Sequence, residues 1–137
     1  RSPNYSPCYH TISKIIECLG QHIQVRHEDM LNAATAVCGC GPAFVAAFLD
    51  SMARIAVDKG FSEKESHLLA LQTVGGTAAL LHKNGMVFAD LVKNVQTKGG
   101  TTEAAFKILI KKKWQQIFEQ ALEAAYSRAR ELATLTQ

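Results

Sequence analysis

Apolar residues follow two different patterns along the chain, and the change falls near residue 27. Before it, apolar side chains three and four positions apart predict a helix. This helix starts at Ser6-Pro7, where serine caps the first turn and proline fits the first helical position, and it stops at Gly20. The alternating segment 22–26 predicts a strand. No other segment predicts a partner strand, so we expect it to be the last strand of a sheet that lies outside this chain.

From Glu28 onward the apolar positions follow a helical period throughout. The predicted helices are a short one that ends at Gly39, a longer one from Pro42 to Gly60, one that starts at a Ser62–Glu65 capping box, a short one over 88–95, one capped by a threonine after the 97–102 turn, and a last one from about Trp114 to Leu132. The sequence therefore predicts a mainly α fold, with a helix and a strand over 1–27 and an all-helical domain over 28–137.

Two glycines, Gly75 and Gly76, lie in the middle of the helix that starts at the capping box. Each costs about 1 kcal/mol relative to alanine in a helix, so their presence needs a reason. Small residues let another backbone approach closely, and that backbone belongs either to another helix of this chain or to a partner subunit. The neighbouring small residues are Ala70, Thr73, Thr77 and Ala79. Because several other helices are also rich in alanine and present apolar faces, we expect a homodimer.

Composition places the chain among globular proteins. Of its 137 residues 47% are hydrophobic and 20% are charged, which excludes disorder as the main state. No run approaches the ~18 apolar residues of a membrane span, and no apolar signal core follows Arg1. We therefore expect a cytoplasmic protein without a membrane partner. Because the chain begins with arginine rather than methionine, we also expect a fragment or a processed product.

The formal net charge of +3 comes from 15 basic and 12 acidic residues, which is small for a protein that binds nucleic acid. We interpret the run Lys111–Lys113 as a solvated helix segment, with a polyanion-binding module as the weaker alternative. The four cysteines lack the spacing of zinc ligands, and no histidine pair accompanies them, so we predict free thiols and no metal site. They are Cys8, Cys18, Cys38 and Cys40.

One turn has the residues of an anion site. The glycines of Gly99-Gly100-Thr101-Thr102 let the backbone bend and expose its N–H groups, and a helix N-terminus follows directly. Such a turn suits a carboxylate or a phosphate, with the Thr102 hydroxyl as a further donor; a simple capped turn remains the alternative. The segment Gly39-Cys40-Gly41 is not a dinucleotide fingerprint, because Phe44 stands at the third glycine position and no convincing strand precedes it.

Four segments resemble, in order and spacing, motifs of one enzyme family. Ala36–Phe44 resembles A-L-S-G-S-G-P-A-Y, Gln72–Ala78 resembles Q-T-V-L-G-A-A, Thr97–Thr102 resembles T-S-P-G-G-T-T less one step at its start, and Leu122–Leu132 resembles a V-E-A-A…R-x-x-E-L ending. The family is pyrroline-5-carboxylate reductase. The resemblance covers nearly the whole chain, because residues 6–27 also look like the last helix and strand of the family's N-terminal dinucleotide-binding domain.

This resemblance implies a fold, a reaction and partners. The fold is a multi-helix C-terminal dimerisation domain of the 6-phosphogluconate-dehydrogenase-like type in residues 28–137, preceded by a remnant of the Rossmann domain in residues 1–27. The reaction is the reduction of 1-pyrroline-5-carboxylate to L-proline with NADPH or NADH, the last step of proline biosynthesis. The implied partners are the small-molecule substrate and a second copy of the chain in a homodimer, with higher oligomers left open and no nucleic acid.

The resemblance also implies the residues of a site. The turn residues that would bind the substrate carboxylate are Thr97, Gly99, Gly100, Thr101 and Thr102. The residues expected near the nicotinamide and the substrate are Thr35, Cys38, Cys40 and Pro42. No catalytic residue and no metal ligand is assigned. The dinucleotide would bind mainly to the N-terminal domain, so we expect this chain alone to be inactive.

The chain departs from the family pattern at four places. Cysteines replace two serines at positions 38 and 40, Thr97-Lys98 replaces Ser-Pro, Lys112-Lys113 replaces Gly-Gly, and residues 85–88 replace an acidic-His-Pro stretch. A cysteine thiol is a weaker hydrogen-bond donor than a serine hydroxyl. These departures favour, as the alternative function, a non-catalytic helical dimerisation module that has lost the reductase activity.

Overall fold

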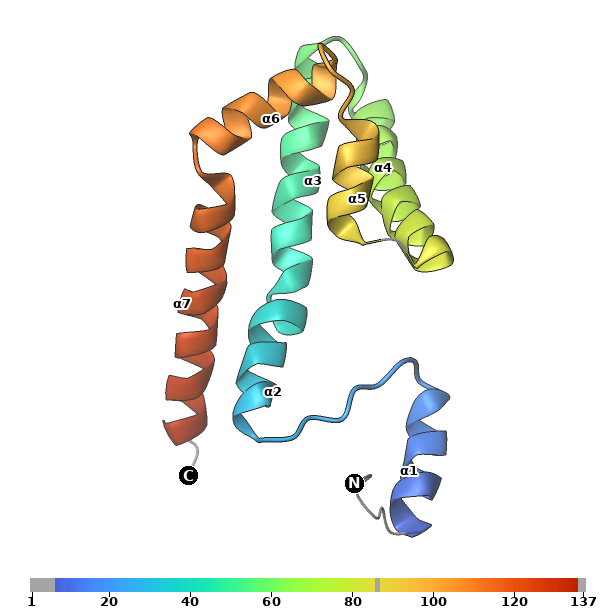
Figure 1. The fold of residues 1–137 in the computed structure, drawn as a ribbon, viewed down its shortest axis with the longest axis vertical. Helices are drawn as coiled ribbons and strands as arrows, with labels where there is room; N and C mark the ends of the chain where they lie inside the picture. The colour runs from blue at the N-terminus through green and yellow to red at the C-terminus, as the bar shows by residue number, and fades with distance from the viewer. Residues whose placement is uncertain (1–6, 86, 136–137) are drawn as a thin grey trace. The chain divides into compact units, whose positions relative to one another are not determined.

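The computed structural model describes residues 7–85 and 87–135, and every regular element in these ranges is helical (Figure 1). The elements are α1 (Pro7–Glu17), α2 (Asp29–Ala34), the π-helical segment η1 (Thr35–Gly39), α3 (Gly41–Asp58), α4 (Glu63–Asn84), α5 (Phe88–Val95), α6 (Thr101–Lys111) and α7 (Trp114–Leu135). Contacts divide the chain into two compact units, Arg1–Leu31 and Asn32–Gln137. The mainly α fold predicted from the sequence is confirmed.

In the first unit, α1 begins at Pro7 as predicted, and a turn follows it up to Gly20. The φ of Gly20 is +144°, a conformation that favours glycine. The predicted strand over 22–26 is wrong, because the segment has no regular structure. A strand is held by a ladder of hydrogen bonds to a neighbouring strand. The described residues contain no neighbouring strand with which this segment could pair. The predicted cap at Ser6 lies outside the described residues.

In the second unit, the predicted helices α3 to α7 are confirmed, and α3 has Pro42 in its first turn. The single short helix predicted to end at Gly39 is instead α2 followed by η1. There the Cys40 N–H donates to the Thr35 carbonyl oxygen, five residues back, at 3.0 Å, which widens the helical turn. Turns of this kind are often found at functional sites.

The capping box predicted at the start of α4 is confirmed. The Glu65 N–H donates to Ser62 Oγ at 3.3 Å, and the Ser62 N–H donates to Glu65 Oε2 at 2.9 Å. The Ser62 hydroxyl also donates to Glu65 Oε2, at 2.6 Å. The hydroxyl hydrogen bond first, and the backbone one second, stabilise the carboxylate and lower the pKa of Glu65 below its ordinary value.

The threonine cap predicted for α6 is wrong. The N-cap residue is Gly100, which has no side chain that could accept a hydrogen bond. The first turn is held instead from within the helix, because Glu103 Oε2 accepts the Gly99 N–H at 2.7 Å. A carboxylate in the first turn also interacts favourably with the positive end of the helix dipole.

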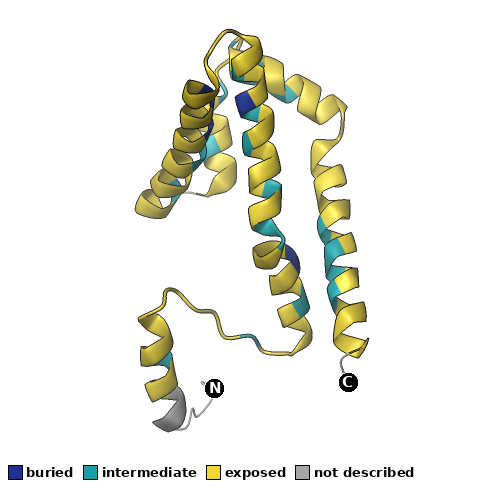
Figure 2. Cartoon of the chain, turned by 180° about the vertical axis from the view of Figure 1, so that it is seen from behind, coloured by how far each residue is buried: buried dark blue, intermediate teal, exposed yellow. Residues whose placement is uncertain are grey.

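Small side chains mark the closest packing in the second unit, where α3 and α4 lie side by side (Figures 1 and 2). Ala53 of α3 and Ser66 and Ala70 of α4 are buried. The Ser66 hydroxyl has no hydrogen-bond partner among the described residues. Small residues let the two helices approach closely, which leaves little room for large side chains between them.

Helix α7 packs against η1, and an aromatic pair links it to the start of α3. The rings of Phe44 and Phe118 meet edge to face, with centroids 5.4 Å apart and an angle of 73° between the ring planes. Ala36 of η1 is also buried. The long helices α3 and α7 therefore share one aromatic contact near the beginning of α3.

Many large apolar side chains of the second unit are exposed, and most of the cartoon in Figure 2 has the yellow colour of exposed residues. Among the described residues, the buried apolar side chains are Ala36, Ala53 and Ala70. Several large ones have about half or more of their surface open to solvent, among them Phe48, Ile55, Leu68, Leu71, Ile108, Ile110 and Ile117. Exposed apolar surface of this extent marks an interaction surface.

The stretch Asp29–Asp58 is long and apolar enough to cross a membrane by length and composition, with a mean hydropathy of 1.5 over its most apolar window. The expectation from the sequence concerned uninterrupted apolar runs, whereas this mean hydropathy is taken over a window. Alanines raise the mean hydropathy here, although polar residues interrupt every run. One such helix is weak evidence, because a core helix of a soluble protein passes the same test. The absence of a membrane partner stays a prediction.

Lys113, between α6 and α7, has a left-handed backbone with a φ of +54°. Its N–H donates to the Ile110 carbonyl at 2.9 Å, and its own carbonyl accepts the Ile117 N–H at 3.2 Å. The residue therefore ends one helix and begins the next. A side chain in this conformation costs roughly 1–2 kcal/mol. The preceding Lys112 has an ordinary φ of −86°.

Ser62→Ala is expected to lower the free energy of unfolding by about 1 kcal/mol at neutral pH, because it removes the acceptor of the Glu65 N–H. Ser51→Ala is the matched control, since the Ser51 hydroxyl only donates to the Ala47 carbonyl. Because folding lowers the pKa of Glu65, the box contributes fully above the ordinary value of 4.5 and loses its contribution as pH falls through the lowered one. Thermal unfolding at neutral pH and at about pH 3 measures both effects. Equal losses in the two variants would contradict the prediction.

Lys113→Gly is expected to raise the free energy of unfolding by about 1 kcal/mol, because glycine adopts the left-handed conformation without strain. Lys112→Gly removes the same charge at an ordinary φ, so it should lower the free energy of unfolding by up to about 1 kcal/mol. Denaturant unfolding of the pair gives both values. A loss of stability in Lys113→Gly equal to that in Lys112→Gly would show that φ at this position is not strained.

Candidate functional site

The predicted anion turn joins α5 to α6. The Gly100 N–H donates to the Thr97 carbonyl at 3.0 Å, which closes the turn. Gly99 has a φ of +76°, in the left-handed region. A Cβ atom on Gly100 would lie 2.5 Å from Thr97 Oγ1 and 3.1 Å from the Thr97 carbonyl oxygen. Both glycines are therefore needed for the shape of the turn, one for its backbone angle and one for the close approach of Thr97.

Glu103 holds the other side of the turn. Its Oε2 atom accepts the Gly99 N–H at 2.7 Å and lies 3.6 Å from Lys107 Nζ. The sequence reasoning missed this residue. The signal that could have found it is an acidic residue three positions after the glycine N-cap, where a side chain can reach back over the first turn of the helix.

The N–H groups left for a ligand are those of the first turn of α6. The Gly99 and Gly100 N–H groups donate within the turn, and the Ala104 N–H donates to the Gly100 carbonyl at 3.2 Å. In the described part of the chain, the N–H groups of Thr101, Thr102 and Glu103 have no acceptor. Thr102 is half-buried and Thr101 is exposed. A helix N-terminus with free N–H groups suits a carboxylate or a phosphate.

The second predicted group of site residues lies around η1. Thr35, Cys38 and Cys40 are in or next to this segment, and Pro42 follows in α3. Cys38 is exposed, Cys40 is half-buried, and both thiols are free. Figure 1 shows the 97–102 turn level with the C-terminal end of α3, whereas η1 adjoins its N-terminal end. Because α3 has 18 residues and is about 27 Å long, one chain does not bring the two groups together.

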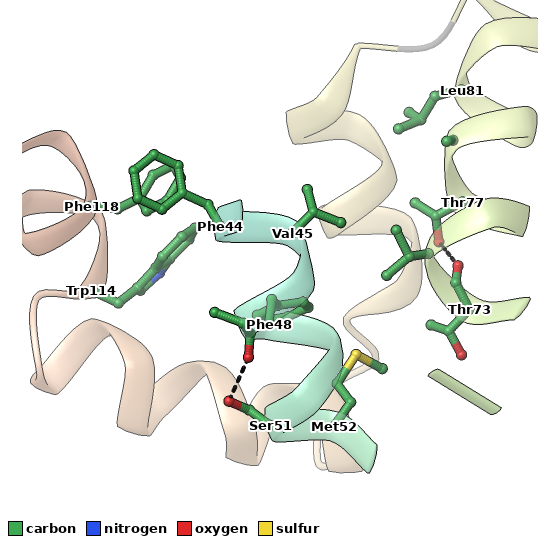
Figure 3. A pocket seen from close by; sticks show the side chains of 13 residues that line it. Phe44, Val45, Phe48, Ser51, Met52, Thr73, Thr77, Leu81, Trp114 and Phe118 are labelled. Atoms are coloured by element: carbon green, nitrogen blue, oxygen red, sulfur yellow. Dashed lines mark hydrogen bonds between the residues drawn. The ribbon is translucent and has the colours of Figure 1, made fainter. Parts of the chain in front are cut away.

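An apolar groove of about 920 Å³ lies between α3, α4 and α7 (Figure 3). Aromatic rings form much of its wall: Phe44 and Phe48 come from α3, and Trp114 and Phe118 come from α7. Leu81 of α4 lies on the opposite wall. The groove is lined by rings and aliphatic side chains, so it suits apolar side chains of another helix better than a small charged substrate.

The hydroxyl groups in the groove do not make it polar. Thr77 Oγ1 donates to the Thr73 carbonyl at 2.7 Å, and Thr73 Oγ1 donates to the Leu69 carbonyl at 2.7 Å. The Ser51 hydroxyl donates to the Ala47 carbonyl at 2.9 Å. Figure 3 shows two of these bonds lying along their own helices. Each hydroxyl therefore donates to a backbone carbonyl of its own helix, four residues earlier.

The two glycines in the middle of α4 have open space around them. A Cβ atom on Gly75 or Gly76 would meet nothing within 4 Å. Close packing against another helix of the same chain therefore does not explain them in the described structure. Of the two explanations that the sequence leaves open, contact with a partner subunit is the one that fits this geometry.

Neither group of site residues forms a metal centre. Within residues 7–85 and 87–135, no cluster of three or more His, Cys, Asp or Glu side chains is placed to hold a metal ion. The exposed Lys98 lies next to Gly99 in the turn and adds a positive charge there. The arrangement can bind an anion through backbone N–H groups, and the carboxylate beside it, Glu103, already accepts the Gly99 N–H and faces Lys107.

A sequence model of the pyrroline-5-carboxylate reductase dimerisation family matches residues 28–132. The chain belongs to this family. The pyrroline-5-carboxylate reductase of Haemophilus influenzae is 31% identical over 134 residues, which are 96% of this chain and 49% of that protein. The pyrroline-5-carboxylate reductase of a Synechocystis strain is 36% identical over 118 residues, 86% of this chain and 44% of that protein. The chain spans about half the length of these relatives.

Solved structures of pyrroline-5-carboxylate reductases share the fold. The enzyme of Coxiella burnetii superposes with a TM-score of 0.87 at 30% identity, over 96% of this chain and 49% of that one. The Plasmodium falciparum pyrroline carboxylate reductase, solved with NADP bound, gives a TM-score of 0.81 at 27% identity, over 96% of this chain and 50% of that one. The resemblance to this reductase family is therefore confirmed for the fold and for the family.

Proposed function

We propose that this chain is the dimerisation and substrate-binding part of a pyrroline-5-carboxylate reductase. The whole protein would reduce 1-pyrroline-5-carboxylate to L-proline with NADPH or NADH, in the cytoplasm. The match of the family over residues 28–132 carries the proposal. Because the chain spans about half of its relatives, the dinucleotide would bind mainly to an N-terminal domain, of which residues 1–27 are the end.

A second copy of the chain is the proposed partner. The exposed apolar faces of α3, α4 and α7 and the groove between them would be covered by the same elements of the other copy. Gly75 and Gly76 would let a partner helix approach the α4 backbone. A dimer of this kind would also allow the turn of one chain to meet η1 of the other, which one chain alone does not allow. Assembly into higher oligomers stays open.

The proposed role of the turn is to hold and orient the substrate carboxylate. The N–H groups of Thr101 and Thr102 and the Thr102 hydroxyl would donate to it, and Lys98 would add attraction at longer range. Thr97, Gly99 and Gly100 would shape the turn, while Thr35, Cys38, Cys40 and Pro42 would lie near the nicotinamide and the substrate. The nicotinamide cofactor would supply the hydride. The contribution of this chain is therefore orientation and electrostatic attraction.

A non-catalytic dimerisation module is the second candidate function. Cys38 and Cys40 favour it, because two thiols stand where the family has serine hydroxyls, and a thiol is a weaker donor. The two functions share the dimer and differ in the chemistry. Formation of proline by the intact protein separates them.

Gly76→Leu is expected to weaken the dimer at least tenfold without reducing helical content, because a Cβ at this position meets nothing within its own chain. Gly76→Ala is the matched control, since its single methyl group improves helix propensity and intrudes little. Light scattering after size exclusion should give twice the chain mass of 15.0 kDa for the unmodified chain and a concentration-dependent mass for Gly76→Leu. A strictly monomeric unmodified chain would contradict the proposed dimer.

The intact protein is expected to oxidise NADPH or NADH when 1-pyrroline-5-carboxylate is supplied. Thr102→Ala should raise KM for this substrate about tenfold, because a hydrogen bond to a charged group is worth about 1.5 kcal/mol. Thr134→Ala, far along α7, is the control. No turnover by the unmodified protein would favour the non-catalytic module, and unchanged kinetics in Thr102→Ala would remove the Thr102 hydroxyl from the site.

A further inference from the structure

The Glu103 carboxylate is less exposed than the carboxylates of the ion pairs Asp50–Arg54 and Glu131–Arg128. Its side chain is 28% exposed, whereas the acids and bases of the other two pairs are each more than 60% exposed. One of its oxygens accepts the Gly99 N–H at 2.7 Å and faces Lys107 Nζ at 3.6 Å. Hydrogen bonds to an ionised acceptor are shorter and stronger than neutral ones. Glu103 is therefore part of the turn and not only of the helix surface.

We infer that Glu103 is a positioning residue of the proposed carboxylate site, which it serves by fixing the turn without touching the substrate. The inference rests on the proposed function. With the Gly99 N–H bound to Glu103 and the Gly100 N–H bound to Thr97, the turn is closed by its own hydrogen bonds. The backbone donors that remain for a substrate are the N–H groups of Thr101, Thr102 and Glu103.

The turn needs such a restraint. Two adjacent glycines have more conformational freedom than any other pair of residues, and Lys98 before them does not restrict φ as a proline would. The bond from Gly99 to Glu103 holds Gly99 at its φ of +76°. It therefore reduces the number of conformations open to the turn, so that the donors of α6 point to one place before a substrate binds. The substrate then does not have to order the turn.

A carboxylate close to an anion site also repels a substrate carboxylate. The effect of the hydrogen bond from Gly99 to Glu103 must therefore be distinguished from the effect of the negative charge of Glu103. Lys107 offsets the charge of Glu103 at 3.6 Å. Glu103→Gln removes the charge and keeps an oxygen that can accept the Gly99 N–H. Glu103→Ala removes both the charge and the acceptor. Positioning therefore predicts that the glutamine variant resembles the unmodified protein, whereas repulsion predicts that both variants bind substrate more tightly.

The first test is steady-state kinetics of the intact reductase. Glu103→Ala should raise KM for 1-pyrroline-5-carboxylate about fivefold, with kcat and the KM for NADPH within about twofold of the original values. Glu103→Gln should restore KM to within about twofold. Glu63→Ala, an exposed acid in the first turn of α4, is the matched control and should change neither constant. An unchanged or lowered KM in Glu103→Ala, or a glutamine variant as impaired as the alanine variant, would overturn the inference.

The second test follows the Gly99 amide itself by hydrogen exchange in the intact protein. Exchange should accelerate about tenfold or more in Glu103→Ala and stay near the original rate in Glu103→Gln, because only the alanine variant frees this N–H. Unchanged exchange in Glu103→Ala would overturn the tether. An intact protein without reductase activity would overturn the proposed function and this inference together, whereas an active protein with unchanged KM in Glu103→Ala would overturn this inference alone.

Discussion

The close approach of α3 and α4 is the constraint on which the rest of the second unit depends. Ala53, Ser66 and Ala70 fill the space between these helices, and they are too small to form a hydrophobic core of their own. The large apolar residues of both helices consequently lie on their outer faces, where Phe48 is 63% exposed. Burying such side chains is worth about 1.5–3 kcal/mol each, and one chain leaves most of that stabilisation unused. The proposed second copy is therefore a requirement of packing as well as of function.

The same geometry decides where a site can form. α3 separates the two groups of residues that the family resemblance assigns to substrate and cofactor, by about 27 Å along the helix. A single rigid helix cannot bend to bring Cys38 and Thr102 together. A site that needs both groups has to take one from each chain, so dimerisation and catalysis would be one property of the protein. A variant that loses the dimer would then lose turnover, even where every residue of the turn is intact.

Most features that depend on residues close together in the sequence were predicted correctly, and features that depend on distant partners were not. Caps and breakers within a few residues placed α3 to α7 correctly, and the Ser62 capping box was found because its two partners are three positions apart. The strand over 22–26 failed because a strand needs a neighbour, and alternation alone does not supply one. The threonine cap failed because Gly100 occupies the N-cap position and has no side chain to accept the N–H groups of the first turn. The sequence identified the turn of the candidate site. It did not identify the N–H groups of the turn that stay free, because these depend on hydrogen bonds that form only in the folded turn.

Two of the departures from the family pattern lie at the two ends of α6. At its start, a side chain restrains a turn that contains Lys98 where the family has proline, and the left-handed conformation is still adopted by Gly99. At its end, Lys113 takes up a left-handed conformation where the family has glycine, supported by hydrogen bonds to residues on both sides. At both joints of this chain one residue has a left-handed backbone, Gly99 with a φ of +76° and Lys113 with a φ of +54°. The first is held by the Glu103 side chain and the second by backbone hydrogen bonds. The thiols at positions 38 and 40 and the charge of Lys98 are the departures that bear on the proposed chemistry, because they change hydrogen-bond donors and the charge near the proposed site.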